Sequence, residues 1–247
     1  HSSIWGIKHI DTFGFENISI RASPFDSIDR LLEGVSQFQD HLVLPSDIHS
    51  YVESQLSSEA GLAEDKIDTL LKLQDLARFY EHYRQYKHNN GFIDYGDMIS
   101  MCCELFEINN VARNKVKSRY DYVLVDEFQD TNYSQLYLVN LLANSNSLTC
   151  VADDDQCIYR FRGAYLSNIK QLEEFYKNLE KIDLGINYRS TSQIVELSRQ
   201  LIGFNPEREK KEIVSANGGI SKVKVVKAPD DISEAEWVAS EINRLIT

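Results

Sequence analysis

The chain has 247 residues and a formal net charge of −12 at pH 7. Hydrophobic residues make up 43% and charged residues 26%, as in an ordinary globular protein, and no apolar run approaches the roughly 20 residues that cross a bilayer. This excludes a membrane-spanning bundle and a surface that is basic all over, although an acidic protein can still carry a local basic groove for nucleic acid. The four cysteines show no metal-ligand spacing, which favours reduced thiols in a cytoplasmic protein.

The first third of the chain is predicted to be mainly helical. Residues 1–28 mix aromatic and β-branched side chains without a clear period. From about Asp29 to Lys87, apolar residues recur at three- and four-residue steps, which predicts a small helical bundle. The tyrosines and the basic residues among residues 79–88 could contact nucleic acid, but aromatic residues at helical spacing more often lie in a core.

A helix is predicted again after a break at Gly91, over residues 92–107. Its predicted apolar face consists of Met98, Met101, Cys102 and Leu105.

Two short apolar runs, residues 121–125 and 148–152, predict β-strands because they are rich in β-branched residues and too short for helices. The helix between them would be capped by Asp130 or Thr131. Strand, helix and strand at this spacing predict a βαβ unit with parallel strands, and hence an α/β fold. The apolar face of the connecting helix is predicted to be Leu136, Val139 and Leu142.

Each predicted strand ends in acids: Asp126 and Glu127 follow the first, and Asp153, Asp154 and Asp155 the second. In open α/β sheets, ligands bind beyond the carboxyl ends of parallel strands. After the first strand, one of Asp126 and Glu127 can hold Mg²⁺ while the other takes a proton from an attacking water. The alternative is an acid-rich, solvated turn without a ligand.

The next predicted elements are a polar helix near 167–179 and a strand around residues 182–184, followed by residues 187–189. Ser190 and Gln193 have the spacing of a capping box and predict the start of another helix.

Near the end of the chain, Gly218 and Gly219 predict a turn before a strand at 220–227. Ser233 and Glu236 form a second potential capping box that would open a final helix.

Three segments, in this order and at these intervals, resemble the UvrD/Rep family of superfamily-one DNA helicases: DEFQDTN (126–132), DDDQCIYRFRGA (153–164) and LGINYRST (184–191). The segment FIDYGDMI (92–99) is also similar to that family. Its members move along single-stranded DNA by hydrolysing ATP between two RecA-like domains. The resemblance implies a RecA-like parallel sheet with helices on both faces, plus a mostly helical insertion. The implied domains are a remnant of the first motor domain (1–28), the helical insertion (29–90), the first motor domain (91–180) and the start of the second (181–247).

The resemblance also implies roles for residues around ATP. Asp126 would hold Mg²⁺, and Glu127 would be the general base for the attacking water. Gln129 would contribute to ATP binding, and Gln156 would sense the γ-phosphate. A neutral amide suits that task because it can both donate and accept hydrogen bonds.

Other implied roles belong to the second motor domain and to DNA. Tyr188 would stack on adenine, and Arg189 would be the arginine finger that stabilises the transferring phosphoryl group. Tyr159 and Phe161 would stack on bases, while Arg162 would serve the backbone of the strand. The implied DNA partners are single strands and duplex junctions.

The chain also departs from the family pattern, because none of its 11 glycines begins G-x-x-x-x-G-K-[ST]. We therefore expect an internal fragment of a longer helicase, which would hydrolyse ATP only at full length. The alternatives are a non-hydrolysing relative that binds DNA or protein, and a metal-dependent nuclease using Asp126, Glu127 and Asp130.

Overall fold

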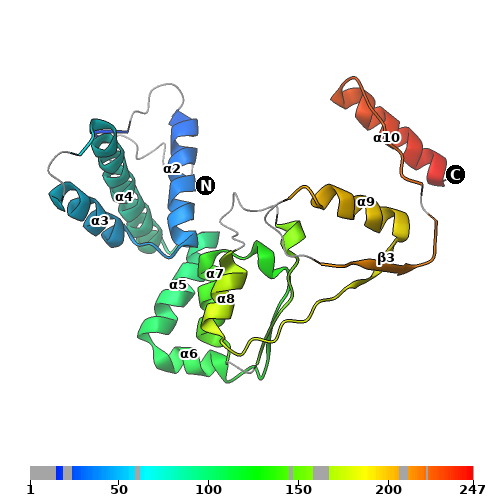
Figure 1. The fold of residues 1–247 in the computed structure, drawn as a ribbon. Coiled ribbons are helices and arrows are strands. Elements are labelled where there is room, and N and C mark those ends of the chain that lie inside the picture. Colours follow the sequence, from blue (N-terminus) through cyan, green and yellow to red (C-terminus); the bar gives the residue numbers. More distant parts are fainter. Residues whose placement is uncertain are drawn as a thin grey trace. The chain divides into compact units, whose positions relative to one another are not determined.

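The computed structural model of the protein describes residues 15–18, 24–58, 62–144, 147–157, 167–205, 211–220 and 222–246 (Figure 1). Contacts divide the chain into two units, His1–Leu179 and Glu180–Thr247, and each is described by itself. Among the described residues, no helix is long and apolar enough to cross a membrane.

The predicted helical bundle consists of α2 (Pro24–Asp40), α3 (Pro45–Ser58) and α4 (Glu64–Asn90). Helix α2 begins earlier than predicted. Gly91 caps the end of α4, and its φ of 65° is the left-handed conformation that glycine adopts readily. The aromatic residues of α4 lie in the core, as the core interpretation predicted. The buried residues of this core are Leu31, Val35, Ile48, Val52, Leu70, Ala77, Phe79, Tyr80 and Tyr83.

Helices α5 (Tyr95–Ile108) and α6 (Asn110–Lys117) follow. The predicted apolar face of α5 was wrong, because Met98, Met101 and Leu105 are exposed. The helix instead buries a partly polar face whose Asp97 pairs with Lys87 of α4, so an ion pair decides which side packs inward. The buried residues of α5 are Asp97, Ser100, Cys103 and Phe106.

The predicted βαβ unit is confirmed. Strands β1 (Val123–Val125) and β2 (Leu148–Cys150) pair in parallel, with Leu124 opposite Thr149, and α7 (Tyr133–Leu142) connects them. Both strands are shorter than predicted. Beneath their ends a small core joins α7 to α8 (Ser167–Phe175), and its buried residues are Phe128, Leu136 and Leu172.

The cap of α7 is Asn132, not Asp130 or Thr131 as predicted. Its side chain accepts from the Gln135 N–H, and Gln135 accepts from the Asn132 N–H in return. Asp130 instead closes a 3₁₀ turn, Phe128–Asp130, and the Thr131 hydroxyl donates to the Phe128 carbonyl. Local geometry thus leaves Asn132 as the residue at the helix entrance.

Asn132→Ala should lower the free energy of unfolding by about 0.5–2 kcal/mol, since it removes an N-cap acceptor. The substitution also removes the bond from the Asn132 side chain to Asp40, the last residue of α2. Urea unfolding would measure the change. Asn114→Ala, at an exposed position in α6, is the matched control and should change stability by less than about 0.5 kcal/mol. An equal effect in both variants would contradict this assignment.

The second unit holds two parallel strands, β3 (Ile186–Thr191) and β4 (Val214–Asn217), and two described helices, α9 (Ser192–Ile202) and α10 (Asp231–Ile246). The predicted strand near 182–184 was misplaced, and residues 187–189 lie within β3 instead of after it. The pairing is irregular between Asn187 and Thr191.

Three further predictions in this unit were wrong. Ser190 does not cap α9, whose N-cap is Thr191 without a side-chain cap bond. Residues 222–228 form no strand, although their apolar residues alternate, because a strand also needs a pairing partner. Helix α10 starts at Asp231, before the predicted cap, and Asp230 accepts from the Ser233 N–H.

Candidate active site

The two acids that follow β1, Asp126 and Glu127, form a tight turn that we call the acidic turn. The chain is fixed on both sides of it, since Val151 N–H donates to the Val125 carbonyl at 2.8 Å and Phe128 N–H donates to the Val151 carbonyl at 2.9 Å. Both acids are exposed, and Glu127 has a φ of 49°. A residue other than glycine in this left-handed region is uncommon, and such residues cluster at functional sites.

Gln129 links the ends of the two strands. Its side-chain nitrogen donates to Glu127 Oε2 at 2.6 Å, and its side-chain oxygen accepts from the Asp153 N–H at 3.0 Å. The residue is only 2% exposed, so the amide bridge is shielded from water.

After β2 the chain forms a 3₁₀ turn, Asp154–Gln156, and residues 153–156 are called the glutamine loop below. One oxygen of Asp153 accepts from the Asp155 N–H at 3.2 Å, and the other accepts from Gln156 Nε2 at 2.7 Å. The carboxylates of Asp153, Asp154 and Asp155 have oxygens within 4.8 Å of one another. With the acidic turn, this edge offers the oxygen donors that a hard cation such as Mg²⁺ prefers.

Of the predicted site residues, the structure therefore brings Asp126, Glu127, Gln129 and Gln156 to one edge of the β1–β2 sheet. Sequence reasoning gave no role to Asp153, although an acid directly before a polar turn is a typical cap and was the available signal. Tyr159, Phe161 and Arg162 lie outside the described residues.

Tyr188 and Arg189 belong to β3 of the second unit. Tyr188 is 76% exposed, so its ring is available for stacking. The Arg189 backbone is held at both ends: its N–H donates to Asn187 Oδ1 at 3.0 Å, and its carbonyl accepts from Asn217 Nδ2 at 3.3 Å. Its side chain is exposed.

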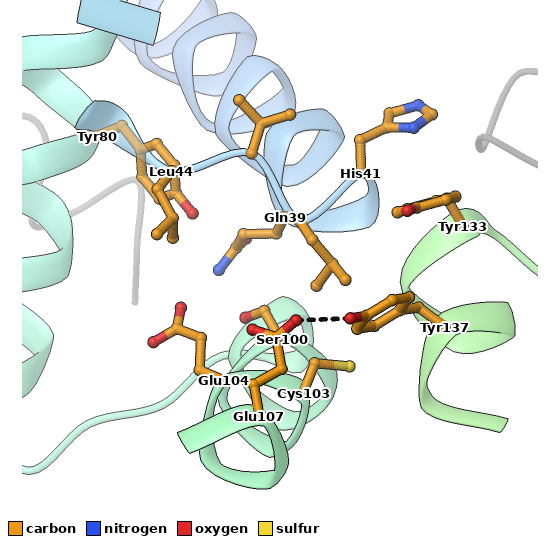
Figure 2. Close-up of a pocket in the computed structure, with 12 residues that line it drawn as sticks. Gln39, His41, Leu44, Tyr80, Ser100, Cys103, Glu104, Glu107, Tyr133 and Tyr137 are labelled. Carbon is orange, nitrogen blue, oxygen red and sulfur yellow. Dashed lines mark hydrogen bonds between the residues drawn. The ribbon is translucent and has the colours of Figure 1, made fainter. Parts of the chain in front are cut away.

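A pocket of about 260 Å³ lies elsewhere in the first unit, between the segment after α2 and helices α4, α5 and α7 (Figure 2). Glu104 and Glu107 contribute carboxylates to it, and the Tyr137 hydroxyl donates to Glu107 at 2.6 Å, which raises the pKa of Tyr137 to about 12. None of the predicted site residues lines it.

Comparison with known proteins agrees with the geometry. Residues 11–177 match the family model of the UvrD/REP helicase N-terminal domain, and residues 182–247 match that of the UvrD-like helicase C-terminal domain.

Individual relatives support the same assignment. The chain is 36% identical over 232 residues to a probable DNA helicase II homolog of Mycoplasma capricolum, covering 93% of this chain and 30% of that protein. It is 38% identical over 192 residues to the ATP-dependent DNA helicase PcrA of Staphylococcus epidermidis (76% and 26%). It is 34% identical over 192 residues to the ATP-dependent DNA helicase Rep of Buchnera aphidicola (77% and 28%). The chain thus spans less than a third of the length of these relatives, and it belongs to the UvrD/Rep helicase family.

Proposed function

We propose that this chain is part of an ATP-dependent DNA helicase that couples ATP hydrolysis to movement on single-stranded DNA and to duplex unwinding. The observation that carries the proposal is the meeting of the acidic turn and the glutamine loop at one edge of a parallel sheet, joined through Gln129. In this reading β1 and β2 are part of a RecA-like sheet with helices on both faces, and α2, α3 and α4 are its helical insertion.

Each site residue then has a separate role around one ATP molecule. Asp126 would hold Mg²⁺, directly or through water, and the metal would supply positive charge to the phosphates. Glu127 orients a water and takes its proton, and Gln156 hydrogen-bonds the γ-phosphate. From the second unit, Arg189 supplies a permanent charge to the transferring phosphoryl group and Tyr188 stacks on adenine. The exposure of Tyr188 and Arg189 supports these roles.

The DNA-binding role falls to Tyr159 and Phe161, whose rings would stack on bases, and to Arg162, which would contact the backbone. Base stacking tolerates any sequence, as movement along DNA requires. The net charge of −12 means that such binding depends on a local surface and not on the charge of the whole chain.

Phe161→Ala should weaken binding of a single-stranded oligonucleotide by about 1–3 kcal/mol, because one stacking face is lost. Fluorescence anisotropy at fixed salt would measure the affinity. Phe204→Ala, which removes a ring that is 86% exposed, is the control and should bind as the unchanged protein does. If Phe161→Ala left the affinity unaltered, Phe161 would have no stacking role.

We also propose a cytoplasmic location. Cys102, Cys103, Cys150 and Cys157 carry no disulfide, which fits a reducing compartment.

The function is tested with protein expressed from its complete reading frame. ATP hydrolysis should require Mg²⁺ and rise on addition of single-stranded DNA, and a duplex with a single-stranded tail should be unwound only when ATP is hydrolysed. DNA binding without hydrolysis would favour the non-hydrolysing relative instead. Cleavage of DNA that depends on a divalent metal would favour the nuclease.

A further inference from the structure

We propose that Gln129 is a positioning residue, which orients the Glu127 carboxylate and ties it mechanically to the glutamine loop. The inference rests on the proposed function, since it concerns the general base of the same reaction. It replaces the expectation that Gln129 itself contributes to ATP binding.

The burial and bonding of Gln129 argue against direct contact with a ligand. At 2% exposure its side chain has almost no surface to offer, and both ends of its amide have partners within the protein. Its backbone carbonyl also accepts from the Cys157 thiol at 3.7 Å, which joins it to the residue that follows the glutamine loop.

The chemistry of these partners fixes the direction of the amide. A backbone N–H can only donate, so the group facing Asp153 N must be the amide oxygen of Gln129. The amide nitrogen therefore faces Glu127, and as a donor it matches an ionised carboxylate. A flipped amide would lose both of these bonds.

The orientation of the Glu127 carboxylate matters because the residue is exposed, so burial does not hold its side chain in place. Its backbone is left-handed, with a φ of 49°. The bond from Gln129 holds Oε2 at 2.6 Å and leaves the other oxygen for a water molecule. A general base is effective only when it lies within hydrogen-bond reach of the proton that it takes.

The same amide connects the base to Gln156. Gln129 holds the Asp153 N–H while the Asp153 side chain holds Gln156, which makes a continuous path from Glu127 to the glutamine. Moving the glutamine loop away would leave a buried amide oxygen without a partner, which is unfavourable. Displacement of Gln156 should therefore displace the Glu127 carboxylate as well.

Gln129→Leu keeps the volume of the side chain and removes both of its bonds. In protein from the complete reading frame it should lower kcat for ATP by about 10- to 100-fold, the usual effect of losing an orienting partner, while the KM for ATP changes little. The loss should vanish when Glu127→Gln is already present, because Gln129 acts through Glu127. Gln37→Leu, at an exposed position of α2, is the control and should be neutral.

Wild-type turnover in Gln129→Leu, or an equal loss with and without Glu127→Gln, would overturn the positioning role and leave the helicase function standing. Absence of ATP hydrolysis in the unchanged protein would overturn both proposals.

Discussion

Glu127→Gln is expected to abolish most ATP turnover while ATP binding is retained. The change keeps the size of the side chain and removes only its ability to take a proton, which is typically worth about 10²- to 10⁴-fold in rate. An amide oxygen at this position can still accept the bond that Gln129 donates, so the geometry of the acidic turn should persist. Steady-state hydrolysis with saturating single-stranded DNA would measure turnover, and a fluorescent ATP analogue would measure binding.

The matched control is Glu53→Gln, which makes the same chemical change at an exposed position of α3. It should leave both turnover and binding unchanged. Hydrolysis at the wild-type rate in Glu127→Gln would remove Glu127 from the role of base, and loss of ATP affinity would instead assign it to binding.

Lys87→Met should lower the free energy of unfolding by about 3–5 kcal/mol, because it leaves the buried Asp97 carboxylate and the partly buried Asp94 carboxylate without their cation. Lys87 is 5% exposed, and its ammonium lies 2.6 Å from an oxygen of Asp94 and 2.6 Å from an oxygen of Asp97. It also lies 4.2 Å from the centre of the Tyr83 ring. The Gln39 amide donates to both carboxylates, so the cluster joins α2, α4 and the start of α5.

The free energy of unfolding lost in Lys87→Met should become smaller as the pH falls. Burial alone would raise the pKa of Asp94, but the Lys87 ammonium and the Asp97 N–H outweigh it and hold the pKa below its ordinary value of 3.8. A carboxyl with a lowered pKa stabilises the fold above the unfolded pKa, and that contribution is lost as the pH falls through the folded pKa. Without the cation, burial should raise the pKa, so the deficit of the variant should shrink on acidification.

Urea unfolding of both proteins at neutral pH and at acid pH would test this. Lys72→Met is the control, because Lys72 forms an exposed pair with Asp68, and such pairs are worth at most about 1 kcal/mol. The role of Lys87 would be contradicted if Lys87→Met lost as little free energy of unfolding as Lys72→Met. It would also be contradicted if that loss grew as the pH fell.

The sequence predicted the features that depend on neighbouring residues. The apolar run before Asp126 is too short for a helix and ends abruptly in acids, so both β1 and the acidic turn could be located. The three- and four-residue spacing in α4 likewise predicted that Tyr80 and Tyr83 would be buried.

The errors concern choices that are made by distant parts of the chain. Which side of α5 packs inward is decided by Lys87, since the ion pair makes it favourable to bury Asp97 in place of the methionines. Three adjacent polar residues, Asp130 to Asn132, can each cap a helix, and only the 3₁₀ turn before α7 selects among them. The bridge from Gln129 to Asp153 spans 24 positions, so no local pattern contains it.

The most direct test of the central claim is a structure of protein from the complete reading frame with Mg²⁺ and a non-hydrolysable ATP analogue. Mg²⁺ is expected about 2.1 Å from an Asp126 oxygen or one water away from it. Glu127 is expected within about 3 Å of the attacking water, with Gln156 and Arg189 on the γ-phosphate. A nucleotide bound elsewhere, with Asp126, Glu127 and Gln156 away from its phosphates, would contradict the central claim.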